Sequence, residues 1–284
     1  MNYKWRKLRN KFFIISLSLA AAICLTPLIL VTSFILQKGA SSLDLNFFTQ
    51  LPAPVGDVGG GMMHAILGTI YMVALGSLIA VPLGIIGGIY LSEFGKGGIS
   101  KSLRIATDVM TGIPSIIIGI FAYILLVVPF KTFSALSGAF ALSLIILPVV
   151  IRSSEEILKL VPNHIREAGL ALGLPRWKVI LFIIVRGNLS ALFTGVMLAV
   201  ARASGETAPL LFTAFGNMYL SSSPMEPMAS LPVQIYTYAI SPFEDWQRQS
   251  WAGAFVLIML VIGVNLGARA ILNPSAIKEF FKRS

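Results

Sequence analysis

Charged residues are scarce in this sequence of 284 residues, of which Asp, Glu, Lys and Arg make up only 12%. Water-soluble proteins carry about 25%. Hydrophobic residues make up 56% of the chain and its mean hydropathy is +0.84, which is more apolar surface than a water-soluble core of this size can bury. The composition therefore excludes an ordinary soluble domain and predicts a polytopic membrane protein.

Cysteine, histidine and nucleotide-binding motifs are also scarce or absent. Cys24 is the single cysteine, which excludes an internal disulfide. His64 and His164 fall on opposite sides of the membrane in the topology given below, and no Cys or His spacing predicts a metal site. The sequence contains no G-x-x-x-x-G-K-[ST] stretch, so ATP binding would require another chain. The sequence therefore predicts no metal and no cofactor.

Long apolar runs predict an all-α fold with six membrane-spanning helices. The spans are expected at about residues 12–36, 65–92, 105–129, 136–151, 187–212 and 251–272, the fifth after a polar break at 186–188. The first span is expected to be an accessory helix beside a core formed by the other five. This divides the chain into residues 1–60, a transmembrane domain at 61–272, and a basic tail at 273–284.

Positive charge is distributed unevenly among the connections between these spans. Sixteen lysines and arginines, not counting Arg186 at the polar break, precede span one, follow span six, or lie between spans two and three or four and five. Only Lys38, Lys131 and Arg248 lie in the other connections. The positive-inside rule makes the first group cytoplasmic, so both termini are expected in the cytoplasm and the chain in the inner membrane. This also accounts for the net charge of +10, and no nucleic-acid partner is predicted.

The longest cytoplasmic connection has the pattern of a short helix at about 163–172. Pro162 suits its first turn, and Gly173 is typical of a helix end. Ala168 and Gly169 are expected on its surface. A short helix with small exposed residues fits a groove on another protein, and the alternative is an amphipathic helix that rests on the bilayer.

This connection resembles the signature loop of ABC importer permeases, which reads Glu-Ala-Ala, three residues, Gly, nine residues, Ile, one residue, Leu-Pro. The matching positions are Glu167, Ala168, Gly173 and Ile183, and the positions that differ are Gly169, Val185 and Arg186. The resemblance implies a type I ABC importer fold, in which helix 163–172 is the coupling helix. It implies that Glu167, Ala168, Gly169 and Gly173 couple this chain to a cytoplasmic ATPase subunit.

Three further stretches narrow the resemblance. "DVMTGIPSIIIGIF", "ARASGETAPLLFTA" and "LPVQIYTYA" are similar to the permease subunits of phosphate-specific ABC importers, in particular the A-type membrane subunit. The likeness covers about residues 60–272. It implies a transport subunit rather than an enzyme, with a second homologous permease, separate ATP-binding subunits and a periplasmic phosphate-binding protein as partners.

Arg202 and Glu206 stand out because they lie inside the fifth apolar run. Arg202 is close to the middle of residues 187–212, where a charge costs at least about 2.5–3.5 kcal/mol to insert. The i, i+4 spacing places both side chains on one helix face. Because a guanidinium fork matches phosphate oxygens, we expect Arg202 to line the ion path and Glu206 to hold it when the path is empty. The alternative is an ion pair that only orients the helix.

The neighbours of this pair are expected to assist it. Ser204 and Thr207 would add hydroxyl donors to the ion path. Gly205 and Pro209 would loosen the helix, so that its backbone N–H groups could reach the anion.

Three other functions remain open from the sequence. The cargo of the same class of importer could be sulfate, molybdate or phosphonate. An ion-driven secondary transporter or anion channel is a second alternative, although such proteins often contain inverted repeats and this chain has no such internal symmetry. A membrane enzyme is the third, and no nucleophile–base or metal constellation supports it.

Overall fold

The structure is a computed structural model that describes residues 3–95 and 97–272. The described residues are mostly helical, with one isolated bridge between Pro52 and Gly60 and no strand, which confirms the predicted all-α fold. Four helices are long and apolar enough to cross a bilayer: α1 (Tyr3–Ala40), α3 (Met63–Glu93), α7 (Ala135–Lys159) and α13 (Glu244–Leu272). The predicted tail at 273–284 lies outside the described residues.

Two bent groups of helices raise the number of candidate spans to six if each group is one span. The first comprises α4 (Gly98–Gly112), α5 (Ser115–Ala122), the π-helical turn η1 (Tyr123–Val127) and α6 (Val128–Phe130). The second comprises α9 (Arg176–Lys178), the π-helical segment η2 (Val179–Val185) and α10 (Leu189–Ser204). The remaining helices are short: α2 (Leu45–Thr49), α8 (Asn163–Ala171), α11 (Ala208–Thr213) and α12 (Leu231–Ala239). Six spans remain a prediction.

The expectation of one continuous helix at 105–129 is wrong. The chain bends by 104° between α4 and the segment that begins with α5. Ile113 and Pro114 have extended backbones, with ψ of 130° and 135°, because the proline ring disfavours helical geometry in the residue before it. We call residues 113–114 the α4–α5 corner.

The fifth span also differs from the expected helix at 187–212. The predicted break at 186–188 is confirmed by a bend of 71° between the α9–η2 segment and α10. The helix then stops at Ser204 and resumes at Ala208. Pro209 explains the second interruption, since it has no N–H to continue the helical ladder and its ring crowds the carbonyl four residues back. We call residues 205–207 the α10–α11 break.

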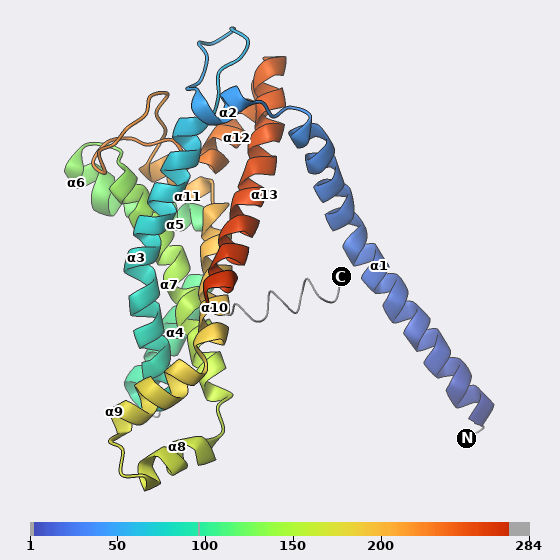
Figure 1. The fold of residues 1–284 in the computed structure, drawn as a ribbon, viewed down its shortest axis with the longest axis vertical. Coiled ribbons are helices and arrows are strands. Elements are labelled where there is room, and N and C mark those ends of the chain that lie inside the picture. The colour runs from blue at the N-terminus through green and yellow to red at the C-terminus, as the bar shows by residue number, and fades with distance from the viewer. Residues whose placement is uncertain (1–2, 96, 273–284) are drawn as a thin grey trace.

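The centre of the bundle is the pair formed by α3 and α7, which run side by side (Figure 1). Glycines on α3 let the two backbones approach closely, as small residues do in membrane helices. A Cβ on Gly76 would lie 2.7 Å from the Ala139 carbonyl oxygen, and one on Gly84 would lie 2.7 Å from Val150 Cβ. These glycines therefore serve helix packing.

Replacing Gly84 with Val should lower the thermal stability of the purified protein. The added side chain would overlap Val150 and separate α3 from α7, at a cost of about 1–3 kcal/mol. The Tm in detergent measures the effect. Gly263→Val in α13 is the matched control, because no atom lies within 4 Å of a Cβ placed there. Equal losses in the two variants would contradict this explanation.

Helix α1 diverges from the bundle and approaches it only near its C-terminal end (Figure 1). There the ring of Phe34 meets the edge of Trp251 on α13, with 5.1 Å between the ring centroids. The apolar side chains from Phe12 to Val31 are largely exposed in the isolated chain. The accessory role assigned to this helix remains a prediction.

Candidate functional site

Two helix interruptions that lie far apart in the sequence meet at Arg202 and Glu206. The guanidinium Nε of Arg202 lies 4.0 Å from Glu206 Oε1, with the Arg202 side chain 58% exposed and that of Glu206 17% exposed. Both line a hollow of about 20 Å³ together with residues of α4, the α4–α5 corner, α5 and α7, namely Met110, Thr111, Ile113, Ser115, Ile118, Ile145, Pro148 and Val149. That volume holds about one water molecule, so an oxyanion would require the surrounding helices to move apart.

The structure does not bring Ser204 to this hollow, which corrects the expectation for its hydroxyl. Two residues beyond Arg202, Ser204 faces away from it and is only 5% exposed. Its hydroxyl donates to the Val200 carbonyl at 2.8 Å. Ser204 instead lines a separate apolar hollow of about 500 Å³ between α3, α10 and α13. Thr207 lies at the N-terminal cap of α11, where its side chain makes no capping bond.

Backbone N–H groups at the α10–α11 break are also engaged. Gly205 N donates to the Arg202 carbonyl and Glu206 N to the Ala203 carbonyl, each at 3.2 Å. The interruption expected from Gly205 and Pro209 is present, but these two donors are occupied within the chain. The expectation that they face an anion is therefore not met in this conformation.

The short helix expected at 163–172 is confirmed as α8 (Asn163–Ala171). Pro162 caps its start, and Gly173 follows its end with φ of +79°, a left-handed conformation that favours glycine at this position. Glu167 and Ala168 are exposed, as is Gly173.

Gly169 is buried, so the expectation that it lies on the surface of α8 is wrong. A Cβ on Gly169 would lie 2.9 Å from Val179 Cγ2 and 3.0 Å from Ile183 Cδ1. The residue therefore lets α8 pack directly against η2, and a larger side chain would push the two helices apart.

Arg166 is a residue of α8 that sequence reasoning missed. Its Nε and Nη2 donate to the Glu93 carboxylate at the end of α3, at 3.1 and 2.7 Å. Nη2 also donates to the Leu158 carbonyl at 3.0 Å, and Nη1 donates to the Val161 carbonyl. The only signal in the sequence was a basic residue beside the signature loop, because Glu93 lies 73 residues away.

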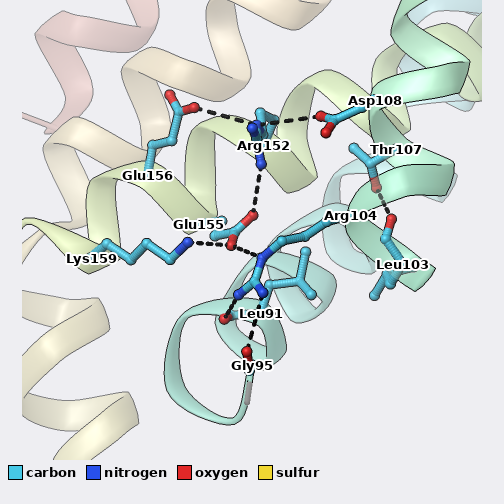
Figure 2. A network of polar contacts seen from close by, with 10 residues as sticks. All are labelled: Leu91, Gly95, Leu103, Arg104, Thr107, Asp108, Arg152, Glu155, Glu156 and Lys159. Atoms are coloured by element: carbon cyan, nitrogen blue, oxygen red, sulfur yellow. Dashed lines mark hydrogen bonds and ion pairs between the residues drawn. The ribbon is translucent and has the colours of Figure 1, made fainter. Parts of the chain in front are cut away.

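A network of charged residues joins α4 and α7 near the end of α3 (Figure 2). Glu155 on α7 is fully buried, and accepts from Arg104 Nε at 2.6 Å and from Lys159 Nζ at 2.5 Å. Arg152 Nη1 lies 3.4 Å from the other Glu155 oxygen, and its Nε lies 3.6 Å from Asp108 on α4. The buried carboxylate thus joins α7 to α4 through Arg104, while Lys159 and Arg152 belong to α7 itself and Arg152 also reaches Asp108 on α4.

Metal-binding side chains do not cluster in the described part of the chain, where no group of three His, Cys, Asp or Glu residues could hold an ion. His64 is buried at the start of α3 and His164 lies on α8. The side chains available for chemistry are therefore the ion pair of Arg202 and Glu206, the exposed face of α8, and the charged networks at the end of α3.

Several apolar helices, two of them interrupted beside an ion pair, define a multi-pass helical membrane protein. Residues 80–273 match the family described as "Binding-protein-dependent transport system inner membrane component". The chain belongs to this family.

Curated relatives are similar in sequence to this chain over nearly its whole length. It is 43% identical to the phosphate transport system permease protein PstA of Haemophilus influenzae over 95% of both chains. It is 44% identical to the protein of that name from Xylella fastidiosa over 95% of this chain and 94% of the relative. With the probable phosphate transport system permease protein PstA of Methanocaldococcus jannaschii it shares 33% identity over 94% of this chain and 95% of the relative.

Solved structures share the fold at low sequence identity. A bacterial ABC transporter involved in the import of the acidic polysaccharide alginate is similar with a TM-score of 0.64 and 13% identity, over 95% of this chain and 98% of that chain. The MetNI methionine ABC transporter in inward facing conformations gives a TM-score of 0.59 and 15% identity, over 75% of this chain and 94% of that chain. These similarities agree with the type I importer fold implied by the sequence.

Proposed function

We propose that this chain is a permease subunit of an ATP-driven importer of inorganic phosphate. The observation that carries the proposal is the identity of 43% over 95% of both chains with a relative named as a phosphate transport permease. An arginine and a glutamate between two helix interruptions agree with a path for an oxyanion, since a guanidinium fork pairs well with phosphate oxygens.

The proposed orientation places both termini in the cytoplasm of a multi-pass inner-membrane protein. The start of α1, the connection between α3 and α4, and α8 lie at one end of the molecule (Figure 1). Described cations at that end include Arg6, Arg9, Lys101, Arg166 and Arg176. The positive-inside rule makes that end cytoplasmic.

The proposed partners are a second homologous permease, cytoplasmic ATP-binding subunits and a periplasmic phosphate-binding protein. A solved structure similar to this chain, with a TM-score of 0.62, is an alginate ABC transporter in complex with an alginate pentasaccharide-bound periplasmic protein. This supports a periplasmic partner of the same general kind. The exposed Glu167 and Ala168 of α8 are the proposed contacts to the ATPase, with Gly169 packing the helix against its own chain and Gly173 ending it.

Replacing Ala168 with Arg should remove the ATPase subunit from the purified complex. Ala168 is exposed on α8, so the larger charged side chain leaves the fold intact but prevents α8 from entering a close-fitting groove. Affinity purification of this chain, followed by quantification of the bound ATPase, measures the loss. Leu160→Arg is the matched control, because Leu160 is 82% exposed outside α8. Undiminished ATPase binding by Ala168→Arg would contradict the coupling role.

The transport function itself is tested by phosphate uptake in cells that lack this chain. Restoring the chain should restore uptake that depends on ATP and is sensitive to vanadate. Sulfate and molybdate uptake, measured in the same cells, test the other oxyanions. Transport by the purified chain alone in liposomes, without any ATPase, would instead support an ion-driven transporter or channel.

A further inference from the structure

Three arginines from different segments converge on the C-terminal end of α3, residues 91–95. Arg104 on α4 donates to the carbonyls of Leu91 and Gly95, at 2.8 and 3.1 Å (Figure 2). Arg176 on α9 donates to the Glu93 carbonyl at 2.7 Å, and its guanidinium lies 4.5 Å from the centroid of the Phe94 ring. Arg166 on α8 binds the Glu93 carboxylate. Cations at this position suit the free carbonyls and the negative end of the helix dipole.

Of the three, Arg166 is the contact that fixes α8. Its side chain is 20% exposed and that of Glu93 is 5% exposed, so water competes little for the pair. Nε and Nη2 bind the Glu93 carboxylate, while Nη1 and Nη2 donate to carbonyls at the end of α7. A planar guanidinium bound on several sides resists displacement in every direction. The packing of Gly169 against η2 resists only compression.

The end of α3 connects α8 with the hollow at Arg202. Arg104 on α4 binds the Leu91 carbonyl at this end, and the same side chain binds Glu155 on α7. Helix α4 ends at Gly112, next to the α4–α5 corner, and residues 111 and 113 line the hollow that Arg202 and Glu206 share. A displacement of residues 91–95 would therefore reach the ion pair through a continuous series of contacts.

We infer that the Arg166–Glu93 pair is the contact that transmits movement of α8 to the end of α3 and, through Arg104 and α4, to the α4–α5 corner. Arg166 and Glu93 are positioning residues in this inference, because neither touches the ion. The inference rests on the proposed function, in which an ATPase moves α8. It adds the route by which that movement reaches Arg202.

The test measures phosphate imported per ATP hydrolysed by the complete complex in proteoliposomes. Arg166→Gln should reduce this ratio about tenfold, within the range of measured coupling energies, while the amount of bound ATPase is unchanged. Glu93→Gln should reduce the ratio by a similar or smaller factor, because Arg166 keeps its bonds to the Leu158 and Val161 carbonyls. The double variant should be no worse than Arg166→Gln, since both single variants remove the Arg166–Glu93 contact. Arg166→Lys should restore part of the ratio because it keeps the charge without the fork.

Arg176→Gln is the matched control. It removes a guanidinium that binds the same end of α3 but belongs to α9 rather than α8, so the phosphate imported per ATP hydrolysed should stay close to the wild-type value. A normal ratio in Arg166→Gln would overturn the inference, as would additive losses in the double variant. Loss of the ATPase from Arg166→Gln would also overturn it, because the pair would then serve assembly. Failure of the proposed function is distinct, since the wild-type complex itself would show no ATP-dependent uptake.

Discussion

Replacing Arg202 with Gln should abolish phosphate uptake while leaving the complex assembled. The guanidinium is 58% exposed, so its removal does not leave a cavity in the protein core. In the proposed ion path, the variant loses the charge that would compensate a dehydrated anion, and charges inside a membrane are expensive and mark functional sites. We expect uptake to fall at least about 100-fold, the effect of losing roughly 2.7 kcal/mol of stabilisation of the ion in transit. Initial rates of radiolabelled phosphate uptake measure it.

Two further variants distinguish a role of Arg202 in the ion path from a purely structural ion pair with Glu206. Arg202→Lys should still impair uptake, because a point charge cannot make the bidentate contact. Glu206→Gln should retain more uptake than Arg202→Gln, since it leaves the cation in place. Wild-type uptake by Arg202→Gln at normal expression would remove Arg202 from the mechanism. Equal losses in Arg202→Gln and Glu206→Gln, together with lowered thermal stability in both, would indicate an ion pair that only orients α10.

Replacing Glu155 with Gln should destabilise the protein more than any other change in its charged networks. Glu155 is fully buried beside Arg104, Lys159 and Arg152, and its neutralisation leaves three cations without their shared anion. Removing one partner of a buried pair costs about 3–5 kcal/mol. Because the three cations are themselves partly exposed, we expect the lower end of that range. The Tm of the purified protein measures the loss.

The adjacent residue gives this prediction its control. The Glu156 side chain is 66% exposed and reaches only Arg152, at 3.4 Å. Exposed pairs contribute about 0–1 kcal/mol, so Glu156→Gln should leave the Tm nearly unchanged. If the two variants unfold at the same temperature, burial of Glu155 is not what stabilises the α4–α7 contact.

Periodicity and composition were sufficient for the parts of the fold that depend on local chemistry. The helix at 163–172 was found because a proline and a glycine mark its ends, and the break at 186–188 because polar residues interrupt an apolar run. The bend at Pro114 was missed because hydropathy does not distinguish a long span from two helices that meet at a corner. The end of α10 at Ser204 agrees with the loosening expected from Gly205 and Pro209, although the expected span continued through it to residue 212.

Contacts between distant residues could not be found in this way. Glu93 and Arg166 are 73 residues apart, and Arg104 and Glu155 are 51 apart, so no helical spacing relates them. The hydroxyl of Ser204 was misplaced because position in sequence was taken as proximity, whereas residues 202 and 204 point to different sides of α10. Arg202 and Glu206 lie beside each other as their spacing of four residues predicts, although α10 ends at Ser204 and Glu206 lies in the α10–α11 break.

The α4–α5 corner also limits how deep the hollow lies. Residues 115–130 supply 16 residues after the turn, and 16 residues of helix reach about 24 Å. The hydrocarbon layer is about 30 Å thick, so in the proposed six-span arrangement, with Phe130 at the outer surface of that layer, the corner would lie inside it. Polar backbone there requires protein or water around it. In that arrangement, an ion released beside Arg202 would cross a shorter dehydrated stretch than the full thickness of the bilayer.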